Sequence, residues 1–281
     1  MAPVFADRPF APIPTPMVIL AKGEKPDEFT VLATEMACVH NFLIRGLNAI
    51  YLQAPHIRTP ADQHAFLNFA HQWYRGLHVH HTGEEELFFP MLEARTGIKG
   101  IMDGNVAQHA QFERGVDELD AYVQRCLQNP SAYDGDKIVG MIDSFGAVLR
   151  QHLADEIPTL LALREHADKL AGMYKEFSDE GAKHMQTLGL FKGAACVIAT
   201  HDVDYEGGLH RGFPPAPAVL VWLLRNVAWW VHRDWWRFAP CDRHGRMKDL
   251  SCNITKGSSA AAAAAAEVRQ ETVSVVRKGD L

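Results

Sequence analysis

The 281-residue chain has few cysteines and no cluster of basic residues. Its five cysteines include no Cys-x-x-Cys pair, which argues against a thiolate metal site and favours free thiols in a reducing, cytoplasmic compartment. Lysine and arginine form no run, and the formal net charge is −6 at pH 7. Nucleic acid and anionic membranes are therefore poor candidate partners. Nothing in the sequence indicates an oligomeric state.

Long hydrophobic runs are also missing. The longest apolar stretch, residues 216–231, is interrupted by Arg225 and is shorter than the ~20 residues that cross a bilayer. The first twenty residues lack a basic segment followed by an apolar one, so we expect no signal peptide. We find no phosphate loop, dinucleotide fingerprint or nucleophile elbow. What the chain has in unusual number is histidine, at 15 residues.

Strand-like alternation is scarce, and helical periodicity fills residues 27–165. We expect amphipathic helices at roughly 27–53, 61–96 and 103–128 and from 134 onward. Their short connections predict an all-α protein, with an up-down-up-down four-helix bundle. The side chains expected to face the core from the second helix are Phe66, Phe69, Trp73, Leu77, Leu87 and Met91.

The segments outside the bundle differ in composition. Residues 1–26 are rich in proline and predict an extended lead-in, and residues 166–256 predict a C-terminal extension of helices and loops packed on the bundle. Residues 257–281 are of low complexity, which predicts a disordered tail. Within the extension, residues 217–237 predict a tryptophan-rich helix. Packing on the bundle is the leading interpretation of this helix, and a membrane-facing or substrate-facing surface is the alternative.

Histidine and glutamate recur at one spacing within the predicted bundle. Residues four apart lie on one face of a helix, so an imidazole and a carboxylate at that spacing reach one buried centre. Chance predicts about one His-x-x-x-Glu pair in a chain of this composition. The sequence has four such pairs, His80/Glu84, His81/Glu85, His109/Glu113 and His152/Glu156. An isolated histidine on an apolar face is more often a core residue than a ligand, but this excess favours a metal site.

The phase of these residues indicates which of them face the core. His40, His109 and His152 lie in register with apolar neighbours on the first, third and fourth helices, and Glu156 follows His152 by one turn. Buried carboxylates are costly unless they are paired or bind a cation. Two hairpins that face each other would bring together four imidazoles and two carboxylates, a set that suits two bridged metal ions. Imidazole with carboxylate favours iron, manganese or zinc, and the residues alone do not choose among them.

Adjacent histidines leave one ligand ambiguous. Phe69, Trp73 and Leu87 lie closer in angle to His80, which favours His80 and Glu84 as the inward pair. Other apolar residues favour His81, so that alternative stays open. The pair that faces away, His81 with Glu85 in our prediction, would support the ligands by hydrogen bonds from outside or lie in solvent.

At these residues the sequence resembles the hemerythrin-like (HHE cation-binding) family over roughly residues 30–165. The stretch HHTGEEELFFPML resembles the second-helix motif of that family, and three further stretches, VHNFLIRGLNAI, VAQHAQFERG and RQHLADEIPTLL, resemble its other ligand segments. The resemblance implies a non-haem di-iron centre that handles dioxygen, nitric oxide or peroxide. The ligands that it implies are His40, His80, Glu84, His109, His152 and Glu156, with the glutamates bridging two iron ions.

Two departures from the family pattern bear on function. Asn105 stands where oxygen-carrying hemerythrins have a fifth histidine, which favours reactivity or ligand exchange over reversible oxygen carriage. Glu113 could add a carboxylate, although a solvated glutamate is our leading interpretation. The stretches FPPAPAVL and WWRFAPCD look similar to extensions on hemerythrin-domain proteins of filamentous fungi. We expect a protein that binds small oxidants, and a di-iron oxidase or oxygenase with a small organic substrate is the alternative.

The sequence contains two further groups of polar residues. The loop with His201, Asp202, Asp204 and Glu206 predicts a capped polar turn, with a second cation site as the alternative. His64, His71 and His78 recur every seven residues and predict a solvated stripe on the second helix.

Overall fold

The computed structural model describes residues 2–20 and 23–251, apart from the side chain of Met185. All regular elements within these residues are helices, and the one strand-like pairing is an isolated bridge between Cys241 and Met247. The prediction of an all-α protein is confirmed. The predicted tail at residues 257–281 lies outside the described residues.

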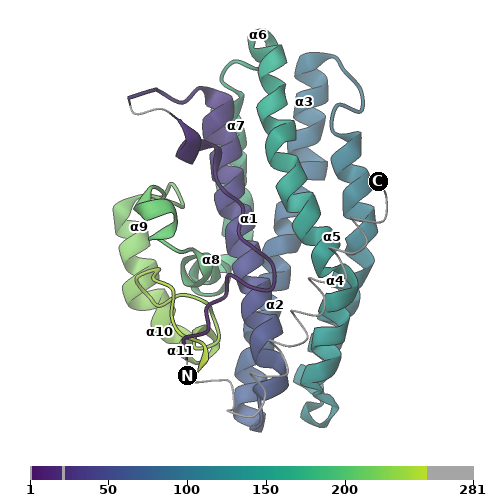
Figure 1. Ribbon diagram of the computed structural model, residues 1–281, viewed down its shortest axis with the longest axis vertical. Helices are drawn as coiled ribbons and strands as arrows, with labels where there is room; N and C mark the ends of the chain where they lie inside the picture. Colours follow the sequence, from purple (N-terminus) through teal and green to yellow (C-terminus); the bar gives the residue numbers. More distant parts are fainter. Residues whose placement is uncertain (1, 21–22, 252–281) are drawn as a thin grey trace.

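Four long helices form the bundle (Figure 1). They are α1 (Glu28–Gln53), α2 (Pro60–Gly83), α4 (Asp103–Gln128) and α5 (Gly135–Ala162). A π-helical turn, Glu84–Phe88, continues α2 into α3 (Phe89–Thr96). Helix α2 packs against α1 and α4, and α5 packs against the same two helices from the other side. Each long helix therefore has two neighbours, and the four together enclose one core.

Polar side chains set the starts of three bundle helices. Asp27 accepts from the backbone N–H of Thr30, Thr59 accepts from that of Asp62, and Asp134 caps α5 in the same way. Such N-caps satisfy backbone donors that have no partner within the helix. The helices begin within a residue or so of the positions that the sequence predicts.

The π-helical turn changes which residues of the second helix are buried. Phe69, Trp73 and Leu77 before the turn are buried as predicted, but Leu87 is 36% exposed and Met91 is only partly buried. The prediction for Leu87 was wrong because it assumed a regular helix. A π-turn holds one extra residue and shifts the inner face by one position. Phe88 and Leu92 consequently fill the core after the turn.

The N-terminal lead-in is bound to α1 by two buried amides. Asn41 exchanges hydrogen bonds with the backbone of Ile13, and the Asn48 side chain bonds the backbone of Phe10. Because these amides satisfy backbone groups that no helix or sheet pairs, the segment stays extended over most of its length. The short 3-10 helix Pro16–Ile19 departs from the predicted extended conformation.

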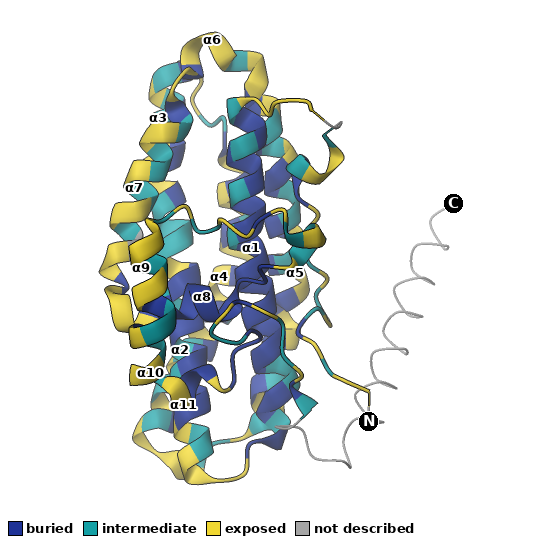
Figure 2. Cartoon of the chain, turned by 90° about the vertical axis from the view of Figure 1, so that its left-hand side faces the viewer, coloured by how far each residue is buried: buried dark blue, intermediate teal, exposed yellow. Residues whose placement is uncertain are grey.

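The C-terminal extension lies along one side of the bundle (Figures 1 and 2). Its helices are α6 (Ala167–Leu170), α7 (Met173–Thr187), α8 (Ala195–Thr200), α9 (Ala218–Leu223), α10 (Trp229–Val231) and α11 (Arg233–Trp236). Helix α8 packs on α1 and α11 packs on α2, so bundle and extension share one hydrophobic core. Among the described residues, no helix is long and apolar enough to cross a membrane.

The tryptophan-rich segment forms several short helices instead of the single predicted one. A π-helical turn, Leu224–Ala228, separates α9 from α10, and His232 leaves the helical conformation at φ −127° and ψ 40°. Trp236 is fully buried, whereas Trp222 and Trp230 are 58% and 53% exposed. The segment therefore buries Leu224, Ala228 and Trp236 in the shared core and leaves Trp222 and Trp230 largely exposed.

Candidate metal centre

Seven histidine and glutamate side chains meet in the middle of the bundle. Each long helix contributes, with His40 on α1, His109 on α4, His152 and Glu156 on α5, and three residues from the end of α2 and the π-turn. Those three are His80, His81 and Glu84. The six predicted residues are thus brought together, and His81 joins them. Their ligand atoms form two groups, and within each group all ligand atoms lie within 4.8 Å of one another.

The first group consists of His40, His80, Glu84 and Glu156. The Nε2 atoms of His40 and His80 are 3.1 Å apart, and Oε2 of Glu156 lies 3.3 Å from Nε2 of His40. Oε1 of Glu84 lies 3.2 Å from Nε2 of His80. Two imidazoles and two carboxylates therefore converge between α1, α5 and the end of α2.

The second group consists of His81, Glu84, His109 and His152. The Nε2 atoms of His109 and His152 are 3.0 Å apart, and Oε2 of Glu84 lies 3.5 Å from Nε2 of His109. Glu84 belongs to both groups and turns one oxygen toward each of them. This is the placement that a bridging carboxylate requires. Glu156 belongs to the first group, so its predicted bridging role stays a prediction.

Three of the histidines make a hydrogen bond from Nδ1 to an acceptor outside the cluster. These outer bonds place the ring proton on Nδ1 and leave Nε2 facing the centre without one. Nδ1 of His40 donates to the carbonyl oxygen of Leu153 at 2.7 Å. Nδ1 of His109 donates to Glu85 at 2.6 Å, and Nδ1 of His152 donates to the side-chain oxygen of Gln108 at 3.0 Å. A neutral imidazole that is protonated on Nδ1 has a lone pair on Nε2. Lone pairs of His109 and His152 thus face each other at 3.0 Å.

The buried carboxylates of the two groups also favour a cation at the centre. Glu84 and Glu156 are 1% and 0% exposed, and none of their four oxygens accepts a hydrogen bond from a described residue. Burial, with the neighbouring Glu156 adding to it, raises the pKa of Glu84 well above its usual value. Uncompensated buried carboxylates are costly, and metal coordination removes that cost. These orphaned oxygens and facing lone pairs show that the donor set fits two cations.

Three of the clustered histidines, His80, His81 and His152, are held in the neutral form that can bind a metal. Burial lowers the pKa values of His80 and His81 well below normal, and neighbouring imidazoles lower them further. The same causes lower the pKa of His152 to about 2. Since a protonated imidazole cannot coordinate a metal, these environments keep the three imidazoles able to bind a cation at neutral pH. Imidazole and carboxylate donors suit iron, manganese and zinc.

Two residues outside the cluster orient its histidines, and the sequence predictions missed one of them, Gln108. Glu85, which we predict either to support the ligands from outside or to lie in solvent, accepts a hydrogen bond from Nδ1 of His109 on α4. Gln108 orients His152 and is itself held by a bond from its amide to Asp155. Gln108 directly precedes His109 in the sequence. Proximity to a clustered histidine is therefore the signal that could have identified Gln108.

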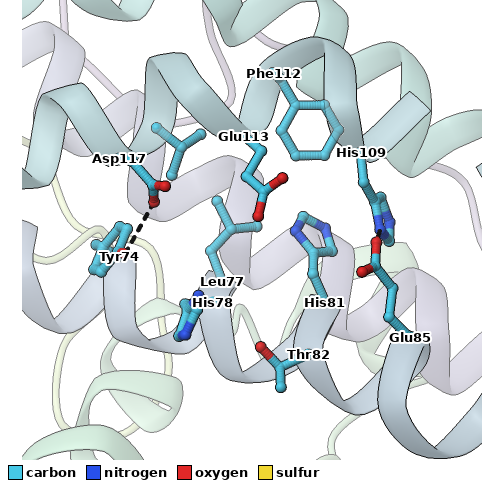
Figure 3. Close-up of a pocket in the computed structure, with 11 residues that line it drawn as sticks. Tyr74, Leu77, His78, His81, Thr82, Glu85, His109, Phe112, Glu113 and Asp117 are labelled. Carbon is cyan, nitrogen blue, oxygen red and sulfur yellow. Dashed lines mark hydrogen bonds and ion pairs between the residues drawn. The ribbon is translucent and has the colours of Figure 1, made fainter. Parts of the chain in front are cut away.

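A small cavity adjoins the second group between α2 and α4 (Figure 3). Its volume is about 60 Å³, and His81 and His109 form its inner wall. Glu113 and Asp117 are exposed at its rim, and Asp117 accepts a hydrogen bond from Tyr74 at 3.0 Å. The cavity connects the surface of the bundle with the second group of ligand atoms.

Other predicted positions lie outside the two groups. Asn105 is buried one turn before His109, and its Nδ2 donates no hydrogen bond to a described residue. Glu113 is exposed, as its solvated interpretation predicted. Of the histidine stripe, His64 and His78 are exposed, while His71 is half-buried and bonds Asp120 on α4.

The loop after α8 is a polar turn within the described residues. Its acidic side chains have separate partners, because Asp204 pairs with Arg211 and Glu206 pairs with His210. Asp202 accepts from the backbone N–H of Asp204, which is a typical capped turn. The interpretation as a polar turn fits this arrangement better than a second cation site.

Comparison with known proteins agrees with this geometry. The family description "Hemerythrin HHE cation binding domain" matches residues 33–163, which span all seven side chains. The chain is 35% identical over 242 residues to "Dimeric xanthone biosynthesis cluster protein R11" of Cryptosporiopsis sp. (strain 8999). That alignment covers 84% of this chain and 90% of the relative. No solved structure matches the chain.

Proposed function

The chain belongs to the hemerythrin HHE cation-binding family, and on that premise we propose that it holds two iron ions and binds a small oxidant. Dioxygen, nitric oxide and peroxide are the ligands proposed. The supporting observation is that Nε2 of His109 and Nε2 of His152 lie 3.0 Å apart beside Glu84. Glu84 belongs to both groups, and its oxygens accept no hydrogen bond from a described residue. Manganese or zinc would satisfy the same donors, so the choice of iron rests on the family.

The ions would supply Lewis acidity and reversible one-electron oxidation, and the chain would supply their environment. His40, His80 and Glu156 would hold one ion, His109 and His152 the other, and Glu84 would bridge them. Glu85 and Gln108 fix the orientation of the second pair of imidazoles by accepting from their Nδ1 atoms. Such outer bonds set the tautomer and raise the basicity of the coordinating nitrogen.

The size of the cavity favours small oxidants over organic substrates. At about 60 Å³ it exceeds the ~10–15 Å³ that one water requires, so a diatomic molecule fits. A pocket for an organic substrate typically measures ~300 Å³ or more. The name of the Cryptosporiopsis relative, which refers to a biosynthesis cluster, supports the alternative of a di-iron oxidase with a small organic substrate. The cavity beside the proposed centre argues against that alternative.

The proposed compartment is the reducing cytoplasm. The described cysteines, Cys38, Cys126, Cys196 and Cys241, are all free and buried. Free thiols of this kind persist where the surroundings are reducing.

Metal analysis with ligand titration tests the proposal. The purified chain is loaded with Fe²⁺ without oxygen, and bound iron is counted before nitric oxide or air is added. We expect two irons per chain and an optical change that saturates with the added oxidant. Loading with fewer than two ions, or spectra that ignore both oxidants, would contradict the proposal. Turnover of an organic substrate by the loaded protein would favour the oxidase alternative.

A further inference from the structure

We propose that His81 is a seventh ligand, which binds the second ion together with His109 and His152. This inference rests on the proposed dinuclear centre and adds to it a residue that the family resemblance does not supply. His81 would make up for the imidazole that is missing at Asn105.

The position of His81 fits the role of a ligand to the second ion. Its Nε2 atom is buried and bonds no described residue. Its ring centre lies 4.3 Å from that of His109 and 5.5 Å from that of His152, and its ligand atom belongs to their group. A core histidine in this place would leave a buried polar nitrogen unsatisfied, which is costly. Coordination of the second ion satisfies it.

The packing of α2 explains how two consecutive residues serve one centre. Neighbouring residues on a helix point about 100° apart, so they normally cannot face one target. Helix α2 occupies a corner of the bundle between α1 and α4. His80 points toward His40 on α1, and His81 points toward His109 on α4. Two ions held with Glu84 would therefore offer a separate target to each histidine.

The residues on α4 show why the second ion lacks a ligand without His81. Position 105 lies one helical turn before His109 on the same face, and it holds an asparagine whose Nδ2 donates to none of the described residues. An amide is a poor ligand for iron or zinc compared with imidazole. Without His81 the second group would have two imidazoles and one shared carboxylate. With His81 it has three imidazoles, while the first group keeps two imidazoles and two carboxylates.

A substitution with a matched control tests this ligand. His81→Gln removes the imidazole, and His78→Gln changes a histidine on the same helix at the exposed edge of the same cavity. Each chain is loaded with Fe²⁺ without oxygen and titrated with a chelator. We expect His78→Gln to keep two ions as the unchanged chain does. In His81→Gln the affinity for one of the two ions should fall. The fall should exceed the ~10–100-fold that is typical when a ligand loses an outer hydrogen-bond partner.

Restoring an imidazole from α4 provides a second test. The double variant His81→Gln with Asn105→His should recover tight binding of the second ion, because position 105 faces the same group. Unchanged affinities for both ions in His81→Gln would overturn the inference while leaving the dinuclear centre intact. Failure of the unchanged chain to bind two ions would instead contradict the proposed function.

A measurement on the unchanged chain covers the case in which His81→Gln does not fold. Co²⁺ is loaded at both sites, and proton spectra are recorded for ring N–H groups shifted by the paramagnetic ions. Five shifted ring N–H signals are expected if His81 coordinates. Four signals in a chain that binds two Co²⁺ would overturn the inference.

Discussion

Nε2 of His109 faces Nε2 of His152 at 3.0 Å, although both rings donate from Nδ1 to acceptors on the opposite side. When the only ring proton of each imidazole is on Nδ1, neither Nε2 atom has a proton to share, so two lone pairs face each other unless a cation lies beside both. The outer bonds to Glu85 and Gln108 therefore favour an arrangement that a cation beside both nitrogens would stabilise. Because of this, metal affinity and folding stability should be linked.

Substitutions of the adjacent Glu84 and Glu85 should distinguish a bridging ligand from a residue that only hydrogen-bonds to a ligand. Glu84→Gln removes the carboxylate shared by both groups, so bound iron should fall well below two per chain. Glu85→Gln weakens only the hydrogen bond to His109, so two ions should bind with affinity reduced ~10–100-fold. Iron content and chelator competition measure both effects. Equal losses in the two variants would contradict the distinction.

The metal-free form of Glu84→Gln should also be more stable than the metal-free unchanged chain. The raised pKa of Glu84 means that the folded chain binds this proton more tightly than the unfolded chain does. Stability from that group is full below the unfolded pKa and declines as pH rises through the folded pKa. At pH 7 the glutamine variant avoids this loss, which urea unfolding of the metal-free proteins measures.

Acid should destabilise the extension through His201. Burial lowers the pKa of His201 to about 4, from an unfolded value of 6.5. The depressed value means that its contribution to stability is present above about pH 6.5 and is lost as pH falls toward 4. Between pH 7.5 and pH 5 that loss is about 2 kcal/mol. His201→Gln should lose correspondingly less stability over this range in urea unfolding.

The exposed His64 provides the control for this effect. His64→Gln should follow the pH dependence of the unchanged chain. A His201→Gln curve parallel to that of the unchanged chain would show that the ring does not titrate in this way.

The sequence predicted most of the fold and six of the seven clustered side chains. Helical periodicity and capping residues act locally, so Asp27 and Thr59 mark helix starts without knowledge of the tertiary structure. His81 was assigned outward because periodicity treats a helix as having one inner face. Helix α2 instead packs against both α1 and α4 and so has two inner faces. The π-turn that begins at Glu84 shifts the buried face of the following residues by one further position. Both are tertiary features that a single-helix pattern does not contain.

The close contact between α1 and α2 should depend on Gly46. A Cβ atom there would lie 2.5 Å from Cδ1 of Trp73, whose ring is buried and donates from Nε1 to the carbonyl oxygen of Leu43. Gly46→Ala should therefore destabilise the fold by roughly 1–3 kcal/mol. Gly140→Ala, at an exposed site on α5 with open space, should instead stabilise it by roughly 0.5–1 kcal/mol. Thermal unfolding measures both, and a neutral Gly46→Ala would contradict the packing.

Two tryptophans of the extension should differ sharply in their contribution to stability. Trp236 is fully buried in α11, which packs on α2, so Trp236→Ala should cost roughly 3–5 kcal/mol. Trp222 is 58% exposed, and Trp222→Ser should change stability by about 0.5 kcal/mol or less. Urea unfolding followed by circular dichroism reports on the bundle and the extension together. A small effect of Trp236→Ala would mean that the extension contributes little to the shared core.

Access to the centre should be slowed by filling the cavity from α2. Thr82 lines the cavity and is half-buried, so Thr82→Phe would place a ring between the solvent and the wall formed by His81 and His109. Stopped-flow mixing of the iron-loaded protein with azide should show an association rate lower by on the order of tenfold, with two irons still bound. Gln111→Phe adds the same ring to an exposed position of α4 outside the cavity lining and should leave the rate unchanged. An unchanged association rate in Thr82→Phe would contradict this route, because it would mean that azide reaches the ions without passing through the cavity.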